Sequence, residues 1–171
     1  LCLGTIDSWL LWQLTQEHVF KTDYSNASRT QLMNLQTLGW DEELAEIFGI
    51  PMECLPQICD SDSVFGYTLM GGLFEKPVPI CAVLGDSHAA LFGQGCLLPG
   101  MSKATYGTGS SLMMNIGEKP IASSHGVVTS LAWKRRGRVE YVLEGNLNYT
   151  GAVITWLKED MKLIQTAGET E

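Results

Sequence analysis

Two stretches of the chain carry residue types that can take part in phosphoryl transfer. Asp86 follows the apolar run Val78–Leu84 and precedes a helical pattern, Ser87–Gln94. The run predicts a buried strand, so we expect the Asp86 carboxylate at the carboxyl edge of a sheet, where open α/β sheets bind their ligands. Further on, Thr105–Ser111 is a glycine-rich turn between two strand-like runs, and such a turn can aim several backbone N–H groups at one anion. A proton acceptor and an anion cradle together indicate phosphoryl transfer.

The segments around these two stretches resemble a known family. They read GDSHAALFGQ at 85–94, KATYGTGSSLMMNIGEKP at 103–120 and YVLEGNLNYTGAVITWLKEDMKLI at 141–164. Together with GTIDSWLLWQLT at 4–15 and TDYSNASRTQLMNLQTLGWDEELAEIFGIP at 22–51, they are similar to the FGGY carbohydrate kinases, closest to the glycerol kinase branch. The resemblance covers nearly the whole chain in order, so it is far more specific than any single short motif.

The resemblance implies an α/β protein with the actin-like ATPase (ribonuclease H-like) fold. Residues 1–96 would form the C-terminal part of the first, substrate-binding lobe, and residues 97–171 the N-terminal part of the second, nucleotide-binding lobe. Leu97–Gly100 would be the hinge, and the two lobes would meet at a cleft. We expect the chain to be the middle section of a longer enzyme and to be inactive by itself.

The resemblance also implies roles for single residues. The Asp that matches Asp86 is the family's general base, so Asp86 is expected to accept the proton of the substrate hydroxyl and to lie near Mg²⁺, directly or through water. The family holds the phosphates of ATP with the turn that matches Gly107-Thr108-Gly109. Gly151 matches a glycine that lies against the nucleotide, and Thr155 stands where glycerol kinases have a nucleotide-contacting Gln.

The same residue types also fit purely structural roles. Asp86 has the type and place of a helix N-cap residue, and hairpin turns favour glycine in any protein. A glycine inside a helix costs ~1 kcal/mol relative to Ala, so Gly151 could be present for close helix packing as well as for a nucleotide. Thr155 is shorter than Gln, which leaves its nucleotide contact open.

Two departures from the glycerol kinase pattern concern the substrate. Ser87 stands where that branch has a substrate-binding Gln, and Ser111 stands where it has a Phe against the glycerol carbons. Both changes put a small hydroxyl in place of a larger side chain. We therefore expect ATP-dependent phosphorylation of a hydroxyl of a sugar or polyol larger than glycerol, such as a tetritol or a pentulose. Glycerol itself, or a nucleotide-binding regulator without transfer chemistry on the same fold, are the alternatives.

A hydrolase is a less favoured reading of the same stretch. Asp86, Ser87 and His88 offer a carboxylate, a nucleophile and a base, but adjacent residues on a helix do not face one another. We expect His88 to be packed or to line the pocket.

The composition argues against several other classes. The net charge of −8 argues against nucleic acid or an anionic membrane surface as a partner. No apolar run approaches the ~20 residues that a membrane-spanning helix needs. The cysteines lack CxxC spacing and predict reduced thiols in a cytoplasmic protein. The resemblance implies that the full-length enzyme is a homo-oligomer with a small-molecule sugar or polyol and ATP as its ligands.

The remaining patterns predict the elements that position these residues. Before Asp86, we expect a buried helix at Ser8–Leu14 capped by Thr5 or Asp7. The polar stretch Thr22–Arg29 is of a kind that caps helices and orders loops, and we expect Asp23, Asn26 and Ser28 to support the site, with direct substrate contact as the alternative. We also expect a helix at Trp40–Gly49, capped by Asp41, with Leu44, Ile47 and Phe48 on its apolar face.

After Asp86, the patterns predict two hairpins and a helix. The hairpins are expected at 102–116 and 126–143, the second around a solvated basic turn, Lys134–Gly137. The helix is expected from about Tyr149 to Met161, capped by Asn148 or Asn146, with Val153, Trp156 and Leu157 on its apolar face.

Overall fold

The computed structural model describes residues 1–170 of the chain. Its α-helices are α1 (Ile6–Leu14), α2 (Tyr24–Ala27), α3 (Glu42–Ile47), α4 (Asp86–Gly93) and α5 (Gly151–Glu159), and 3₁₀ turns span Met52–Cys54, Met70–Gly72 and Ala167–Thr170. Its strands are β1 (Lys21–Asp23), β2 (Met33–Asn34), β3 (Gly39–Trp40), β4 (Gln57–Cys59), β5 (Gly66–Thr68), β6 (Val78–Ile80), β7 (Ser102–Tyr106), β8 (Ser110–Gly117), β9 (Val128–Arg135) and β10 (Arg138–Leu147).

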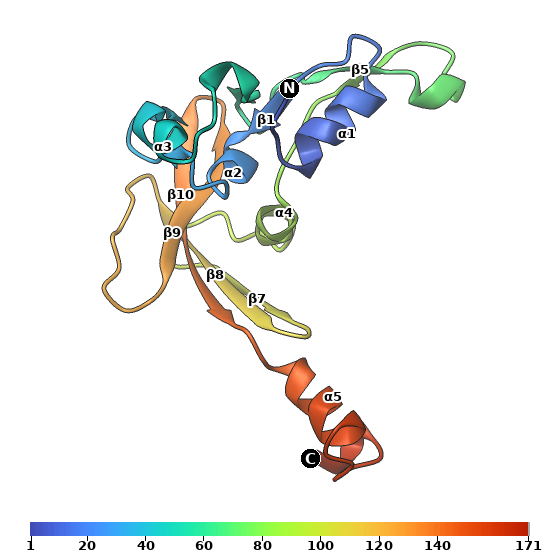
Figure 1. Cartoon of the computed structure of the whole chain (residues 1–171), viewed down its shortest axis with the longest axis vertical. Coiled ribbons are helices and arrows are strands. Elements are labelled where there is room, and N and C mark those ends of the chain that lie inside the picture. Colours follow the sequence, from blue (N-terminus) through green and yellow to red (C-terminus); the bar gives the residue numbers. More distant parts are fainter. Residues whose placement is uncertain (171) are drawn as a thin grey trace.

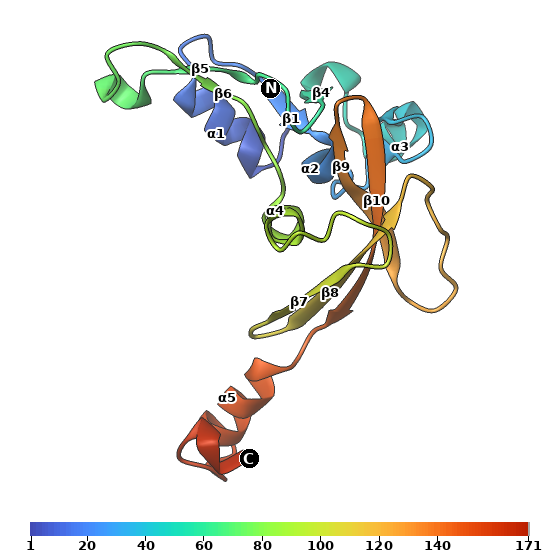
Figure 2. The ribbon, with the colours of Figure 1, turned by 180° about the vertical axis from the view of Figure 1, so that it is seen from behind.

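One antiparallel sheet, with strand order β7-β8-β10-β9, runs through the middle of the molecule. Figure 1 shows α1, α2 and α3 near one end of this sheet and α5 beyond the other end, so that the N- and C-terminal ends of the chain lie far apart. Seen from behind in Figure 2, α4 lies between α1 and β7. The other strands pair in twos, β1 with β4 in parallel and β2 with β3 and β5 with β6 antiparallel. Both hairpins expected from the sequence are present.

The hydrophobic core covers the large sheet with two clusters of side chains. In one cluster, Leu91 of α4 packs with Met113 and Trp133 of the sheet. In the other, Tyr24 of α2 packs with Leu131 and Tyr141. Each cluster joins residues from both sides of position 96, so the hydrophobic core is continuous across the predicted lobe boundary. The division into two lobes at that position stays a prediction.

The strand expected before Asp86 is shorter and more exposed than its sequence indicates. Strand β6 ends at Ile80 rather than at Leu84, and Val78 is 41% exposed, so the prediction of a buried strand at Val78–Leu84 was wrong. Pro79 has no backbone N–H to donate, and within residues 1–170 β6 pairs with β5 alone. Asp86 therefore follows an irregular segment instead of the end of a strand.

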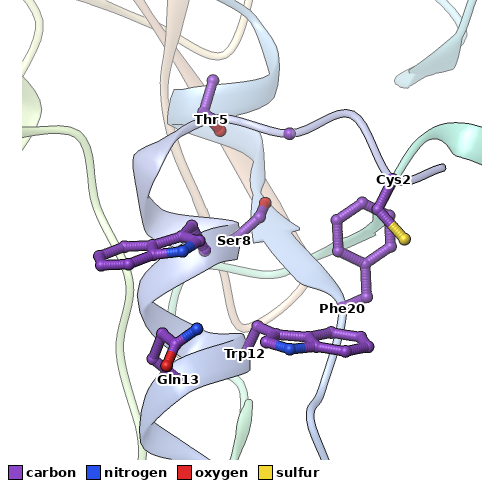
Figure 3. A pocket seen from close by; sticks show the side chains of 8 residues that line it. Cys2, Thr5, Ser8, Trp12, Gln13 and Phe20 are labelled. Carbon is purple, nitrogen blue, oxygen red and sulfur yellow. The ribbon is translucent and has the colours of Figure 1, made fainter.

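Helix α1 forms where expected, with Thr5 at its N-cap position, but it is not a buried helix. Leu11 is buried, whereas Trp9 is 56% exposed and Trp12 is 38% exposed. A cavity of about 350 Å³ opens beside the helix, and Figure 3 shows the rings of Trp12 and Phe20 lining it. The expected burial was wrong because, within residues 1–170, only the side of α1 that packs on β1 and β5 is covered.

Helix α3 confirms its predicted cap but not its predicted apolar face. The Asp41 carboxylate accepts a hydrogen bond from the Leu44 backbone N–H at 3.1 Å, and this interaction lowers the pKa of Asp41, after a larger contribution from the Asn34 side chain. Ala45 is the buried residue of α3, whereas Ile47 and Phe48 are exposed.

The basic turn between β9 and β10 is not merely solvated, so this prediction was wrong for Lys134. The Lys134 ammonium lies 3.2 Å from an Asp60 carboxylate oxygen and 4.7 Å from the centroid of the Tyr24 ring. The Ser61 backbone N–H donates to the Lys134 carbonyl at 2.7 Å, and the Arg136 backbone N–H donates to Asp62 Oδ1 at 3.3 Å. The turn is therefore anchored to the loop that follows β4.

No helix within residues 1–170 combines the length and the apolar character that crossing a membrane requires.

Candidate active site

Asp86 is the first residue of α4, and its carboxylate is exposed. Gly85 holds the N-cap position, and within residues 1–170 the one hydrogen bond that the Asp86 carboxylate accepts comes from the Ser87 backbone N–H, at 2.6 Å to Oδ1. The alternative reading of Asp86 as the N-cap residue was therefore wrong. The carboxylate stays available to a ligand.

A polar cavity of about 120 Å³ opens at this end of α4. It collects residues from the start of α4, from the segment around α2 and from the facing strands of the sheet. Its lining consists of Asn26, Arg29, Gly85, Asp86, Ser87, His88, Met113 and Glu144. The sequence predicted Asp86 and Ser87 for this site, and the structure puts both in one cavity together with a second carboxylate, which is buried.

That second carboxylate belongs to Glu144 of β10, which is only 6% exposed. Arg29 Nη1 donates to Glu144 Oε2 at 2.5 Å, and the Ser111 hydroxyl donates to Glu144 Oε1 at 3.3 Å. Ser111, the other residue predicted to touch the substrate, is thus tied to the cavity through Glu144. A carboxylate has about four lone-pair positions, so Glu144 can still accept a hydrogen bond from a ligand hydroxyl.

The start of α4 is held in place by the polar loop that the sequence assigned a supporting role. The buried Asp23 carboxylate accepts hydrogen bonds from Ser25 Oγ at 2.9 Å, Asn26 Nδ2 at 2.8 Å and Ser61 Oγ at 2.7 Å. Ser25 Oγ in turn accepts the Gly85 backbone N–H at 2.8 Å. A continuous chain of hydrogen bonds therefore connects the end of β1 to the residue before Asp86. The Ser28 hydroxyl is not part of this chain, because its one partner within residues 1–170 is the Ser25 carbonyl.

His88 is buried in the wall of the cavity, at 3% exposure, as the sequence predicted for a packed or pocket-lining residue. Its Nε2 atom has no hydrogen-bond partner within residues 1–170. Burial lowers the pKa of His88 to about 4, against the opposing effect of the Asp23 carboxylate. The imidazole is therefore neutral at physiological pH.

The glycines of the β7–β8 turn allow a close approach to the start of α5. A Cβ atom on Gly109 would lie 2.7 Å from the Leu147 carbonyl oxygen, and one on Gly151 would lie 2.5 Å from the Gly107 carbonyl oxygen. The Gly151 and Ala152 N–H groups donate to the carbonyls of Gly107 and Thr108, at 2.9 and 3.0 Å. The predicted nucleotide residues Gly107, Thr108, Gly109 and Gly151 are thus in contact with one another.

These contacts correct the expected cap of α5. Thr150, and neither Asn148 nor Asn146, holds the N-cap position, and no side chain caps the helix. The turn carbonyls bind the N–H groups that an N-cap side chain would otherwise bind. No residue of α5 is buried, so the predicted packing of Val153, Trp156 and Leu157 is not observed within residues 1–170.

The Thr155 hydroxyl does not bond the β7–β8 turn. It donates back to the Gly151 carbonyl at 3.4 Å within α5, and the Thr155 side chain is exposed. The structure places it one helical turn after Gly151, so it lies on the same side of α5 as the glycine contact.

Sequence reasoning missed Arg29 and Glu144. Arg29 stands at the end of the polar stretch Thr22–Arg29, where Asp23, Asn26 and Ser28 were the residues expected to support the site. Glu144 stands in a predicted strand, and no role was expected for it. Glu144 carried a usable signal, because it is a charged residue directly after the apolar run Tyr141–Leu143 of a predicted strand.

The residues of this site are compatible with Mg²⁺ bound mainly by other groups. No cluster of at least three His, Cys, Asp or Glu side chains able to hold a metal occurs within residues 1–170. Magnesium in phosphoryl-transfer sites is commonly held by one or two carboxylates, waters and substrate phosphates. The single exposed carboxylate of Asp86 fits that requirement.

Comparison with known proteins places this architecture in a class and a family. The crystal structure of Plasmodium falciparum glycerol kinase with ADP aligns with 98% of this chain and 34% of its own length, with a TM-score of 0.89 and 37% identity. The xylulose kinase of Lactobacillus acidophilus, at 23% identity and a TM-score of 0.77, shares the fold. The chain therefore has the predicted fold, that of the actin-like ATPases.

The chain belongs to the FGGY family of carbohydrate kinases. The model of the family's N-terminal domain matches residues 2–93, and the model of its C-terminal domain matches residues 102–171. Glycerol kinase 1 of Thermotoga maritima is 54% identical over the whole chain, and the glycerol kinase of Desulfitobacterium hafniense is 47% identical. The chain spans 35% of the length of each of these two relatives.

Proposed function

We propose that the full-length enzyme, meaning a protein of the relatives' length that contains this chain, transfers the γ-phosphoryl group of ATP to a hydroxyl of a sugar or polyol. The observation that carries this proposal is the exposed Asp86 carboxylate in a polar cavity beside the β7–β8 hairpin, whose glycine turn contacts the start of α5. Membership of the FGGY family supports it.

In this reaction Asp86 accepts the proton of the attacking hydroxyl. Asp86 is exposed at the start of a helix and forms no ion pair within residues 1–170, so its carboxylate can face a substrate hydroxyl without first breaking one. Ser87 and Ser111 would bind other hydroxyls of the substrate, and the Gly107-Thr108-Gly109 turn with Gly151 and Thr155 would hold the nucleotide. Mg²⁺ would neutralise charge on the ATP phosphates, with Asp86 as the nearby carboxylate, directly or through water.

The proposed substrate is larger than glycerol, a tetritol or a pentulose. Ser87 and Ser111 leave more space than the Gln and Phe of glycerol kinases, and Glu144 adds an acceptor beside Ser111. Glycerol is the second candidate, and it is favoured by the identity of 54% to a glycerol kinase.

A comparison of substrates tests both candidates. ADP release by the full-length enzyme is measured with glycerol, erythritol, xylulose and ribulose, for wild type and for Asp86→Asn. We expect kcat/KM for a four- or five-carbon substrate to exceed that for glycerol, and Asp86→Asn to lower kcat about 10²–10⁴-fold. A preference for glycerol selects the second candidate, whereas ATP binding with no stimulation by any polyol identifies a regulator.

Two further proposals concern the whole enzyme. We place the enzyme in the cytoplasm, because the five cysteines of this chain all lie within residues 1–170 and are all free thiols. We also expect a homo-oligomer, which a molar-mass measurement on the full-length enzyme would check.

A further inference from the structure

Lys103 of β7 is a buried cation without a counter-ion. The residue is 2% exposed, and its ammonium donates to the Thr105 hydroxyl at 2.7 Å. Within residues 1–170 no carboxylate lies within ion-pair distance of it, and Thr105 is its one hydrogen-bond partner. An ammonium has three N–H donors, and a buried charge is costly unless it is paired. The position therefore requires an anion.

The register of the sheet shows which way this ammonium faces. Lys103 and Thr105 are two residues apart and share one face of β7, so the Lys103 side chain runs along the strand toward the Gly107–Gly109 turn. Directly opposite on β8, Lys103 pairs with Met113 and Thr105 pairs with Ser111. Opposite residues of an antiparallel pair lie on the same face.

That face is the one that borders the Asp86 cavity. Met113 lines the cavity, and Ser111 hydrogen-bonds Glu144, which also lines it. Glu144 is the β10 partner of Met113, so it lies on the same face as well. The unpaired ammonium thus shares its sheet face with the acceptor site and points toward the turn proposed to hold the ATP phosphates.

We propose that the Lys103 ammonium binds the phosphoryl group while it is transferred. This inference rests on the proposed kinase function. The substrate oxygen forms a bond to the γ-phosphorus, the bond from that phosphorus to the β–γ bridging oxygen breaks, the hydroxyl proton goes to Asp86, and ADP leaves. The Lys103 ammonium neutralises charge on the oxygens of the transferred group. A neutral polyol alone would leave the buried cation uncompensated.

The test uses Lys103→Met in the full-length enzyme, which removes the charge and retains a long flexible side chain. We expect kcat/KM to fall about 10²–10³-fold, as for the loss of one donor to a transition-state oxyanion. Affinity for a non-hydrolysable ATP analogue should fall about tenfold or more, while affinity for ADP, which lacks the γ-phosphoryl group, stays unchanged. The matched control is Lys119→Met, an exposed lysine for which neither quantity should change.

The two affinities keep this inference separate from the kinase proposal. If wild type turns over no polyol, the kinase proposal fails, and Lys103 is still judged by the ratio of the ATP-analogue and ADP affinities. Wild-type kinetics and affinities in Lys103→Met would overturn the assignment of Lys103.

A structural role for Lys103 gives a different result. If the counter-ion is a carboxylate elsewhere in the full-length enzyme, Lys103→Met leaves that carboxylate unpaired and lowers the melting temperature strongly. Lys103→Gln, which keeps a donor to Thr105, is the second variant. Equal loss of ADP and ATP-analogue affinity in Lys103→Gln, together with a lowered melting temperature, would overturn the assignment.

Discussion

The Ser25 hydroxyl accepts a hydrogen bond from the Gly85 backbone N–H at 2.8 Å while it donates to the buried Asp23 carboxylate at 2.9 Å. One hydroxyl thus connects the end of β1 to the residue before the proposed general base, Asp86. Ser25 does not line the Asp86 cavity. It is a positioning residue for the start of α4.

Replacing Ser25 with Ala should lower both stability and turnover. The half-buried Gly85 N–H would lose its partner, which costs about 1 kcal/mol in unfolding free energy. A shift of the Asp86 carboxylate would lower kcat roughly tenfold to a hundredfold with little change in the KM for ATP. Denaturant unfolding and steady-state kinetics of the full-length enzyme measure these quantities. The control is Ser28→Ala, whose hydroxyl bonds only the Ser25 carbonyl, and equal kcat losses in both variants would contradict the positioning role.

The buried His88 makes stability depend on pH in a defined range. Because burial lowers its folded-state pKa to about 4, the unfolded chain binds more protons than the folded one between about pH 4 and 6.5. The stabilisation is complete above pH 6.5 and is lost as the pH falls toward 4, by roughly 3 kcal/mol in total.

The free energy of unfolding of wild type and His88→Gln across this pH range measures that effect. The difference between the two proteins should change with pH as described. Identical pH profiles for wild type and His88→Gln would show that His88 does not titrate in this way.

Breaking the ion pair between Arg29 and Glu144 should destabilise the protein measurably. Arg29→Met leaves the nearly buried Glu144 carboxylate without its cation, and because Arg29 itself is 42% exposed we expect a loss of about 2 kcal/mol rather than the full cost of a buried pair. The exposed pair of Arg138 and Glu118 is a matched control, and Arg138→Met should cost less than about 0.5 kcal/mol. Equal losses in the two variants would contradict the importance of burial at Glu144.

Ser111→Phe should shift the substrate preference of the full-length enzyme toward glycerol. The larger ring fills space beside Glu144 and removes the hydrogen bond from Ser111, so kcat/KM for five-carbon substrates relative to glycerol should fall about tenfold. Leu112→Phe places the same ring on the opposite face of β8 and serves as the control. The prediction fails if both variants keep the wild-type ratio.

Gly151→Ala should be harmful although alanine favours helices. The added Cβ would lie 2.5 Å from the Gly107 carbonyl oxygen, so the turn and α5 must separate, and we expect a loss of about 1–3 kcal/mol together with weaker ADP binding. Gly93→Ala in α4 has no atom within 4 Å of its new Cβ and should be neutral or stabilising by up to ~1 kcal/mol. Calorimetric titration with ADP and thermal unfolding distinguish the two.

The local parts of this molecule could be predicted from sequence, because they depend on neighbours in the chain. The two hairpins follow from strand patterns broken by glycine, and the Asp41 cap follows from a single side chain at a helix start. Asp86 and Ser87 line the same cavity because they are adjacent in the chain.

Contacts between distant segments could not be predicted in the same way. Glu144 meets Arg29 across 115 positions, and the carbonyls that bind the first N–H groups of α5 come from a turn more than 40 positions earlier. No local pattern reports such a meeting. The exposure of Trp9 and Trp12 on α1 likewise depends on which other segments pack against the helix, and the composition of the helix does not report that.

Lys134, Arg136 and Gly137 bind the loop after β4, the last two through backbone N–H groups that donate to Asp62 and Asp60. These contacts restrict movement of the large sheet relative to that loop. A rigid swing of the large sheet away from that loop would break the contacts of Lys134 with Asp60 and Tyr24 and the backbone bond from Ser61 simultaneously. The far tip of the sheet, around Thr108, contacts the end of β10 and the start of the unburied α5. Flexing to admit and release a nucleotide would therefore be concentrated at that tip, with the base of the sheet as a fixed pivot.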